Sequence, residues 1–173
     1  MTMLFARLLG SAFGTLSPRV RALHLREGAT RWRGEVEVER GRGSLAALCI
    51  RATRLPPPGR GPIEVEIVAG EKDERWTRHV GGHAMRSQLW EADGLLCERL
   101  GLVTFGFALS ARDGAIEWRV VRVRALGVPL PARWFGAVAA REFEADGRYR
   151  FDVQAALPLA GPLVRYRGWL DVD

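Results

Sequence analysis

Short runs of alternating apolar and polar residues, separated by glycine turns, fill the chain from residue 63 to residue 172. In segment 63–69, for example, apolar residues alternate with Glu64 and Glu66, which is the period of a strand with one buried face. Turn sequences such as 93–94 and 113–114, both Asp-Gly, separate neighbouring runs. Because such short links join antiparallel neighbours, the pattern predicts about ten antiparallel strands in a sheet wide enough to curl or close.

The first 61 residues predict two helices around one strand. Apolar residues recur at helical spacing from Leu4 to Leu16, and we expect Gly14 and Pro18 to end this helix. A strand follows over about residues 31–40, and Ser44 is placed to cap a helix that runs to about residue 53. The proline-rich run 56–62 is expected to be a stiff connector, because proline suits neither a helix interior nor a central strand.

These patterns predict an α+β fold. We expect a curved antiparallel sheet or a partly open β-barrel of about ten strands, covered or plugged by the two N-terminal helices. The length of 173 residues and the 47% hydrophobic content suit a single domain over residues 1–173. Residues 1–61 would supply the helix-strand-helix unit and the connector, and residues 62–173 the antiparallel strands.

The net charge of +6 comes almost entirely from arginine, since Lys72 is the sole lysine. Most arginines alternate with acids, as in segment 31–39, where both share the solvent face of the predicted strand. The strongest candidate for a basic patch combines Arg148 and Arg150 with Arg165 and Arg167 on two neighbouring C-terminal strands. No nucleic-acid motif or interleaved aromatic set accompanies it, so we do not expect nucleic acid or an anionic membrane as the partner.

Three further features bear on compartment and cofactors. Cys49 and Cys97 lie in apolar strings, as small core residues of a reduced compartment do. The opening segment 1–14 carries Arg7 within its apolar stretch and lacks the pattern of a secretion signal, so we expect a cytoplasmic location. His79 and His83 flank two glycines and lack an evident third ligand, so we expect neither a metal nor another cofactor.

A few polar residues interrupt the apolar faces of the predicted strands. Arg78, Ser87 and Glu98 each share a strand face with apolar neighbours two positions away. If those faces point inward, the guanidinium, hydroxyl and carboxylate enter one interior, where Arg78 and Glu98 could pair in bidentate fashion. By the same reasoning, Glu142 and Tyr166 could join this cluster.

The order of several sequence elements resembles the bacterial family known as domain of unknown function 4166. The elements are Leu23 and His24; Trp76 and Arg78; Ser87; Glu98, Arg99 and Gly101; the block 127–131; Glu142; and the closing segment 161–170. The resemblance covers nearly the whole chain. It implies a domain that occurs alone or behind other modules, including dehydrogenase-like dinucleotide-binding domains, and it brings no established activity or catalytic residues.

The function stays open among several interpretations. A buried ion-pair network without chemistry is the simplest account of the polar cluster. The function that we favour is a non-catalytic binding module for an apolar or amphipathic small molecule on the concave face of the sheet. Arg78 would then hold an acidic head group, with Ser87, Glu98, Glu142 and Tyr166 beside it. The apolar pocket would be lined by Phe105, Phe107, Trp118 and Phe151.

Two alternatives remain. One is an enzyme that uses Arg78, Glu98 and Glu142 for acid and base chemistry, which separation in sequence alone cannot recognise. The other is an accessory protein that docks to a dehydrogenase-like oxidoreductase, and it rests on association between modules rather than on chemistry.

Overall fold

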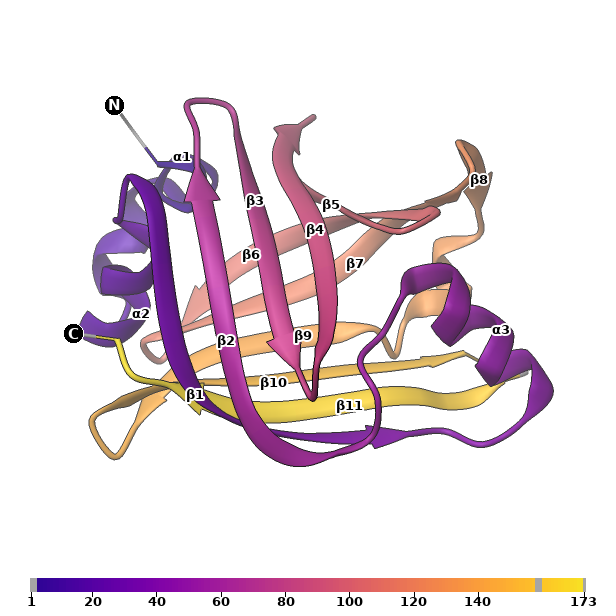
Figure 1. Ribbon diagram of the computed structural model, residues 1–173. Helices are drawn as coiled ribbons and strands as arrows, with labels where there is room; N and C mark the ends of the chain where they lie inside the picture. The colour runs from indigo at the N-terminus through magenta and orange to yellow at the C-terminus, as the bar shows by residue number, and fades with distance from the viewer. Residues whose placement is uncertain (1–2, 158–159, 173) are drawn as a thin grey trace.

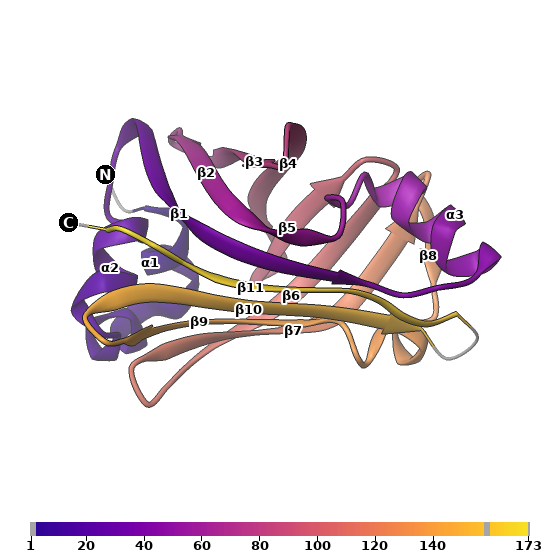
Figure 2. The same cartoon turned by 60° about the horizontal axis from the view of Figure 1, so that its bottom comes forward.

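The computed structural model describes residues 3–157 and 160–172 and shows a closed antiparallel β-barrel (Figures 1 and 2). Its strands are β1 (Gly28–Arg40), β2 (Gly59–Ala69), β3 (Asp73–Val80), β4 (His83–Ala92), β5 (Leu95–Leu100), β6 (Val103–Arg112), β7 (Ala115–Ala125), β8 (Val128–Leu130), β9 (Ala139–Ala145), β10 (Arg148–Leu157) and β11 (Gly161–Leu170). Within these residues ten strands form the barrel in the order β6-β5-β4-β3-β2-β1-β11-β10-β9-β7, and β6 pairs with β7 to close it. The short β8 adds to β7 outside the ring. The predicted fold class is confirmed.

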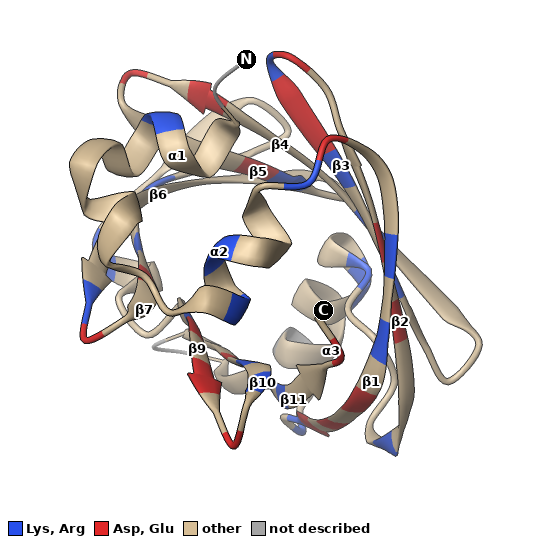
Figure 3. Ribbon diagram, turned by 90° about the vertical axis from the view of Figure 1, so that its left-hand side faces the viewer, with Lys and Arg blue, Asp and Glu red and all other residues tan. Residues whose placement is uncertain are grey.

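Helices lie at both ends of the barrel. The helical segments are α1 (Leu4–Leu9), the 3-10 helix η1 (Gly10–Thr15), α2 (Pro18–His24), α3 (Ser44–Thr53) and the 3-10 helix η2 (Ala132–Phe135). Figure 3 looks onto the end that α1 and α2 cover, with α3 at the far end. We call these the plugged end and the α3 end.

Apolar side chains and backbone hydrogen bonds hold the plug in the barrel. Phe5 of α1 and Val20 of α2 are completely buried in the core. The backbone nitrogen of Ser17 donates to the carbonyl oxygen of Gly114 at 2.9 Å, and that of Arg19 donates to a carboxylate oxygen of Glu144 at 3.0 Å. The plugged end is therefore fixed to the turn between β6 and β7 and to β9.

Strand parity places the side chains as the sequence predicts. On β1, Val36 and Val38 are buried, whereas Arg33 faces outward and pairs with Glu64 of β2 at 3.0 Å. The Asp-Gly turns 93–94, 113–114 and 146–147 have positive φ at both residues, the geometry of a type I′ hairpin. Gly101 lies in the turn between β5, which ends at Leu100, and β6, which begins at Val103.

The predicted basic patch lies on the outer wall, where acids balance much of its charge. Arg165 makes two hydrogen bonds to the Asp152 carboxylate, at 2.7 and 3.1 Å. Arg167 contacts Glu37 and Glu39 of β1, Arg150 pairs with Asp146, and Arg148 lies 4.0 Å over the Trp169 ring. Most of the patch is thus a set of ion pairs across neighbouring strands.

The N-terminal helix prediction is wrong in its extent. The α-helix ends at Leu9, because Gly10 adopts a φ of 55° in the left-handed region, and the chain continues as η1. Pro18 begins the helix α2, which the sequence reading did not anticipate. Proline is favoured at the first helical position, where its missing N–H costs no hydrogen bond.

One other boundary differs from the expectation. Residues 59–62 belong to β2 and pair with β1, although they were predicted as connector. The strand β3 pairs with β2 only as far as Ile63, so at Pro62 the side of β2 that faces β3 has no partner strand. Proline is tolerated at such an unpaired edge, because its missing N–H is not needed for a ladder hydrogen bond.

Gly34 on β1 tests how closely the strands approach. A Cβ atom there would lie 1.8 Å from the carbonyl oxygen of Trp169 on β11. We expect Gly34→Ala to lower the free energy of unfolding by about 2 kcal/mol or more, measured by urea denaturation. Gly61→Ala on β2 is the control, because its Cβ would meet nothing within 4 Å. Equal losses in the two variants would contradict this account of β1 and β11.

Candidate functional site

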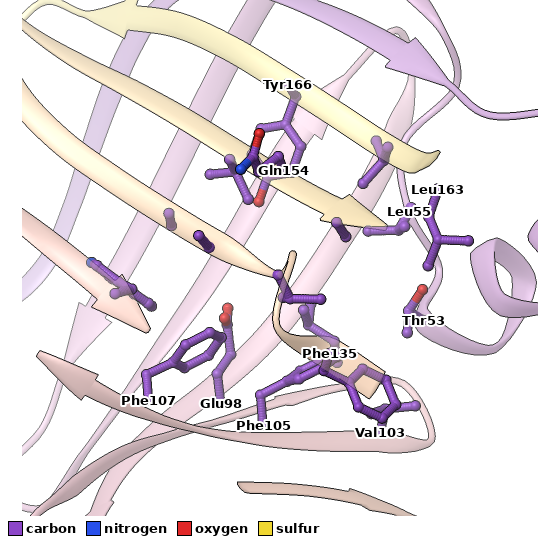
Figure 4. Close-up of a pocket in the computed structure, with 18 of the residues that line it drawn as sticks. Thr53, Leu55, Glu98, Val103, Phe105, Phe107, Phe135, Gln154, Leu163 and Tyr166 are labelled. Carbon is purple, nitrogen blue, oxygen red and sulfur yellow. The ribbon is translucent and has the colours of Figure 1, made fainter. Parts of the chain in front are cut away.

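A cavity of about 520 Å³ occupies the barrel interior. Its wall is mostly aromatic and aliphatic, and it includes all four predicted wall residues, Phe105, Phe107, Trp118 and Phe151. Figure 4 shows Phe105, Phe107 and Phe135 on one side of this space, with Glu98 beside them and Tyr166 across it. The volume falls within the range of roughly 300–1,000 Å³ that is typical of small-molecule sites.

Exposure of the lining residues locates the opening of the cavity. Leu48 of α3 is 64% exposed and Trp134 of η2 is 46% exposed, whereas Trp76 and Trp118 are buried. Phe5 of the plug lies against those two buried rings, with centroids 6.2 and 5.6 Å away. The cavity therefore has its floor at the plug and opens at the α3 end. We call this opening, between α3 and η2, the mouth.

Arg78, Ser87 and Glu98 converge from β3, β4 and β5. Nη1 of Arg78 donates to the Ser87 hydroxyl at 3.0 Å, and Nη2 donates to Oε1 of Glu98 at 3.3 Å. All three residues are buried, and the guanidinium also lies 4.9 Å over the Trp76 ring. The predicted convergence is confirmed, but the hydrogen bonds are divided between Ser87 and Glu98 instead of being bidentate to the carboxylate. Arg78 and Glu98 line the cavity, and Ser87 lies behind them.

The charge of Arg78 is stabilised within the barrel. Burial alone would lower the pKa of this guanidinium, but the charge of Glu98 and the neighbouring Tyr166 and Tyr149 raise it above its usual value. Arg78 is therefore a permanent cation. Glu98 supplies the opposite charge that a buried guanidinium requires.

A second polar cluster lies where the plug meets the cavity floor. Nε2 of His24 on α2 lies 2.5 Å from Oε2 of Glu142 on β9, and both side chains are buried. Tyr149 of β10 is hydrogen-bonded to the same carboxylate. Nδ1 of His24 has no hydrogen-bond partner among the described residues, while its ring lies 3.7 Å from that of Phe5. Glu142 and Tyr149 line the cavity, so this cluster forms part of its floor.

The two tyrosines of the cavity stay neutral at physiological pH. Burial, followed by the charge and hydrogen bond of Glu142, raises the pKa of Tyr149 well above its usual value. Burial raises the pKa of Tyr166 to about 12, against the lowering effect of Arg78. As predicted, Tyr166 lies in the same interior as Arg78, since both line the cavity.

Sequence reasoning missed three members of this interior. His24 was noted for the family resemblance and was not expected in this cluster, because α2 was not predicted. Glu74 is buried, and one of its carboxylate oxygens accepts a hydrogen bond from Nε1 of Trp76 at 2.8 Å. Glu74 and Tyr149 lie in phase with Arg78 and Phe151 on their strands, so strand parity could have identified both.

The other candidate ligands lie outside this interior. His79 is exposed, and Nε2 of His83 lies 2.9 Å from the carbonyl oxygen of Arg54. The described part of the chain holds no group of three or more His, Cys, Asp or Glu side chains placed for a metal ion. Among the same residues, no helix has the length and apolar character needed to span a membrane.

Comparison with known proteins places the chain in a family. The family described as Domain of unknown function (DUF4166) matches residues 16–170. The chain belongs to this family. Among curated proteins none matches it in sequence.

Two solved structures are similar to this DUF4166 chain. Rv2717c from M. tuberculosis has 14% sequence identity and a TM-score of 0.46, over 91% of this chain and 99% of that one. A thioesterase II candidate from Thermobifida fusca YX has 10% identity and a TM-score of 0.25, over 90% of this chain and 83% of that one.

The Arg78–Glu98 pair gives a double-mutant test. Arg78→Met leaves a buried carboxylate without its cation, so we expect the free energy of unfolding to fall by about 3 kcal/mol or more. Adding Glu98→Leu removes the uncompensated charge and should recover most of this loss, as urea denaturation would show. Arg165→Met on the outer wall is the control and should have a much smaller effect. If the double variant lost as much unfolding free energy as the two single variants lose together, the pairing of Arg78 with Glu98 would be contradicted.

Glu74 gives a pH test. Burial raises its pKa above the ordinary value of 4.5, so the protonated carboxyl favours the folded state. This contribution is fully present below the ordinary pKa and is lost as the pH rises through the folded-state value. Gln imitates the protonated form and keeps an acceptor for Trp76. We therefore expect Glu74→Gln to match the wild type in acid and to exceed its unfolding free energy at neutral pH, measured by denaturation across pH. A difference in unfolding free energy between Glu74→Gln and the wild type that grew as the pH fell would contradict this account.

Proposed function

We propose that this chain is a binding module for an apolar or amphipathic small molecule held inside the barrel. The observation that carries the proposal is the cavity itself, which is apolar along its walls and open at the α3 end. Each methylene group transferred from water into such a site gains about 0.8 kcal/mol. The cavity is therefore suited to a flexible chain or a ring system with little charge.

The polar groups of the interior narrow the class of ligand. Arg78 already has Glu98 and Ser87 as partners, and Glu142 has His24 and Tyr149. An acidic head group at Arg78, as expected from the sequence, would have to compete with Glu98 for the same cation. An alcohol or a carbonyl can exchange hydrogen bonds here without adding an unpaired charge. We therefore infer a ligand whose polar end is uncharged.

The experiment uses the neutral fluorescent probe N-phenyl-1-naphthylamine and fills the cavity by mutation. Ala140 lines the cavity, so Ala140→Phe should lower probe affinity at least about tenfold, because the ring occupies the ligand volume. Ala108→Phe on β6 is the control, because Ala108 does not line the cavity and should leave affinity unchanged. Probe binding that is absent, or equal in both variants, would overturn the proposal.

Displacement of the probe then tests the polar end. Dodecanol should displace the probe at lower concentrations than dodecanoic acid. The ionised acid would bring a negative charge into the cavity, where Arg78 is already paired with Glu98 and no other cation among the described lining residues compensates that charge. The reverse order would contradict the uncharged polar end and would leave the binding function itself in place.

One observation favours a second candidate, an enzyme that uses acid and base chemistry. Glu142 faces the cavity and lies 2.5 Å from Nε2 of His24, so a carboxylate with a histidine behind it borders the ligand volume. This candidate would be supported if a substrate screen found turnover and Glu142→Gln abolished that turnover while probe affinity was retained. The docking of this chain to a dehydrogenase-like protein stays a prediction.

A further inference from the structure

The two ends of the barrel differ in charge. At the plugged end the hairpin turns carry acids, namely Glu71, Asp93, Asp113 and Asp146, and Figure 3 shows acidic residues in red at the hairpin tips of this end. At the α3 end, the described residues of the connections 41–58, 81–82, 101–102 and 126–138 include no Asp or Glu. They include Arg42, Arg51, Arg54 and Arg133. The plugged end also holds Arg7, Arg19, Arg21, Arg26 and Lys72, but acids largely offset their charge. Among the described residues of the α3-end connections, no acid offsets the four arginines.

Exposed apolar side chains gather at the same end. Among the described residues, the large exposed hydrophobic side chains are Leu25, near the plug, and five others at the α3 end: Leu48, Leu102, Leu126, Val128 and Trp134. They come from α3, the β5–β6 turn, the β7–β8 hairpin and η2. We call these five residues, together with the four arginines, the rim.

Backbone hydrogen bonds join parts of the rim. The nitrogen of Leu102 donates to the carbonyl oxygen of Ala52 on α3 at 3.1 Å, and the nitrogen of Leu126 donates to that of Leu102 at 2.9 Å. The β5–β6 and β7–β8 connections are therefore fixed to each other and to α3. Leu48 and Trp134 both line the cavity, so the rim surrounds the mouth.

We propose that the rim docks on the surface of a bilayer that contains anionic lipid. Exposed leucine and tryptophan side chains gain free energy at the boundary of headgroups and acyl chains, where tryptophan is enriched. Arginine side chains are attracted to an anionic surface, and no acid among the described residues of these connections opposes that attraction. A nucleic acid would match the arginines but would leave the apolar side chains without a partner.

Docking of this kind reverses the expectation from the sequence, which excluded an anionic membrane, and it uses residues other than the patch on which that expectation rested. Arg148, Arg150, Arg165 and Arg167 lie on the outer wall, mostly against acids. Docking through the rim would turn the mouth toward the acyl chains, so an apolar molecule could enter the cavity without crossing water. The surface itself is independent of the cavity's function, because docking requires no bound ligand.

The test is flotation of the full chain with phosphatidylcholine vesicles, with and without phosphatidylglycerol. We expect binding to the anionic vesicles, weaker binding to the neutral ones and loss at high salt. Arg51→Glu with Arg133→Glu should weaken binding by about tenfold or more, and Leu126→Ser should weaken it severalfold. The control is Arg75→Glu with Arg112→Glu, which changes the net charge equally on exposed residues toward the plugged end and should bind as the wild type does.

Three outcomes would overturn the proposal. The first is no binding to anionic vesicles at low salt. The second is equal loss in both charge-reversed variants, which would indicate attraction by net charge alone. The third is self-association that Leu126→Ser abolishes, in the absence of vesicle binding, which would make the rim an interface between copies of this chain. None of these results would affect the probe-binding test of the cavity.

Discussion

Closure of the sheet by the pairing of β6 with β7 is the constraint on which the other features depend. It gives both outer strands a partner and forces the inward faces of ten strands to share one enclosed space. Side chains do not fill that space, and a cavity of about 520 Å³ remains. Closure also removes water from any polar residue on an inward face, so each of them needs a partner inside the barrel.

The polar interior follows from that need. The Arg78 guanidinium has Glu98 and Ser87 as partners, and the Glu142 carboxylate has His24 and Tyr149, so both groups have partners inside the barrel. The plug contributes directly, because His24 comes from α2 and Phe5 of α1 packs on its ring. The plug thus closes one end of the barrel and completes the floor of the cavity. This leaves the α3 end as the open side of the cavity.

Strand parity explains what the sequence could predict. Residues two apart share a face, so the inward direction of Arg78, Ser87 and Glu98, and of the aromatic wall at Phe105 and Phe107, followed from their neighbours. Pairing between distant segments could not be predicted in this way. The β1–β11 ladder and the His24–Glu142 contact, 118 residues apart, depend on closure and on α2. Pro18 was read as the end of a helix, although proline is also favoured at the start of one.

The most direct measurement of the central claim is a crystal structure of the protein grown with dodecanol. The account predicts continuous density for the alkyl chain along the wall formed by Phe105, Phe107 and Phe151, with the hydroxyl among the polar groups near Tyr166. It also predicts that the Arg78–Glu98 pair stays intact. An interior filled by its own side chains, or dodecanol bound only on the outer wall, would contradict the claim.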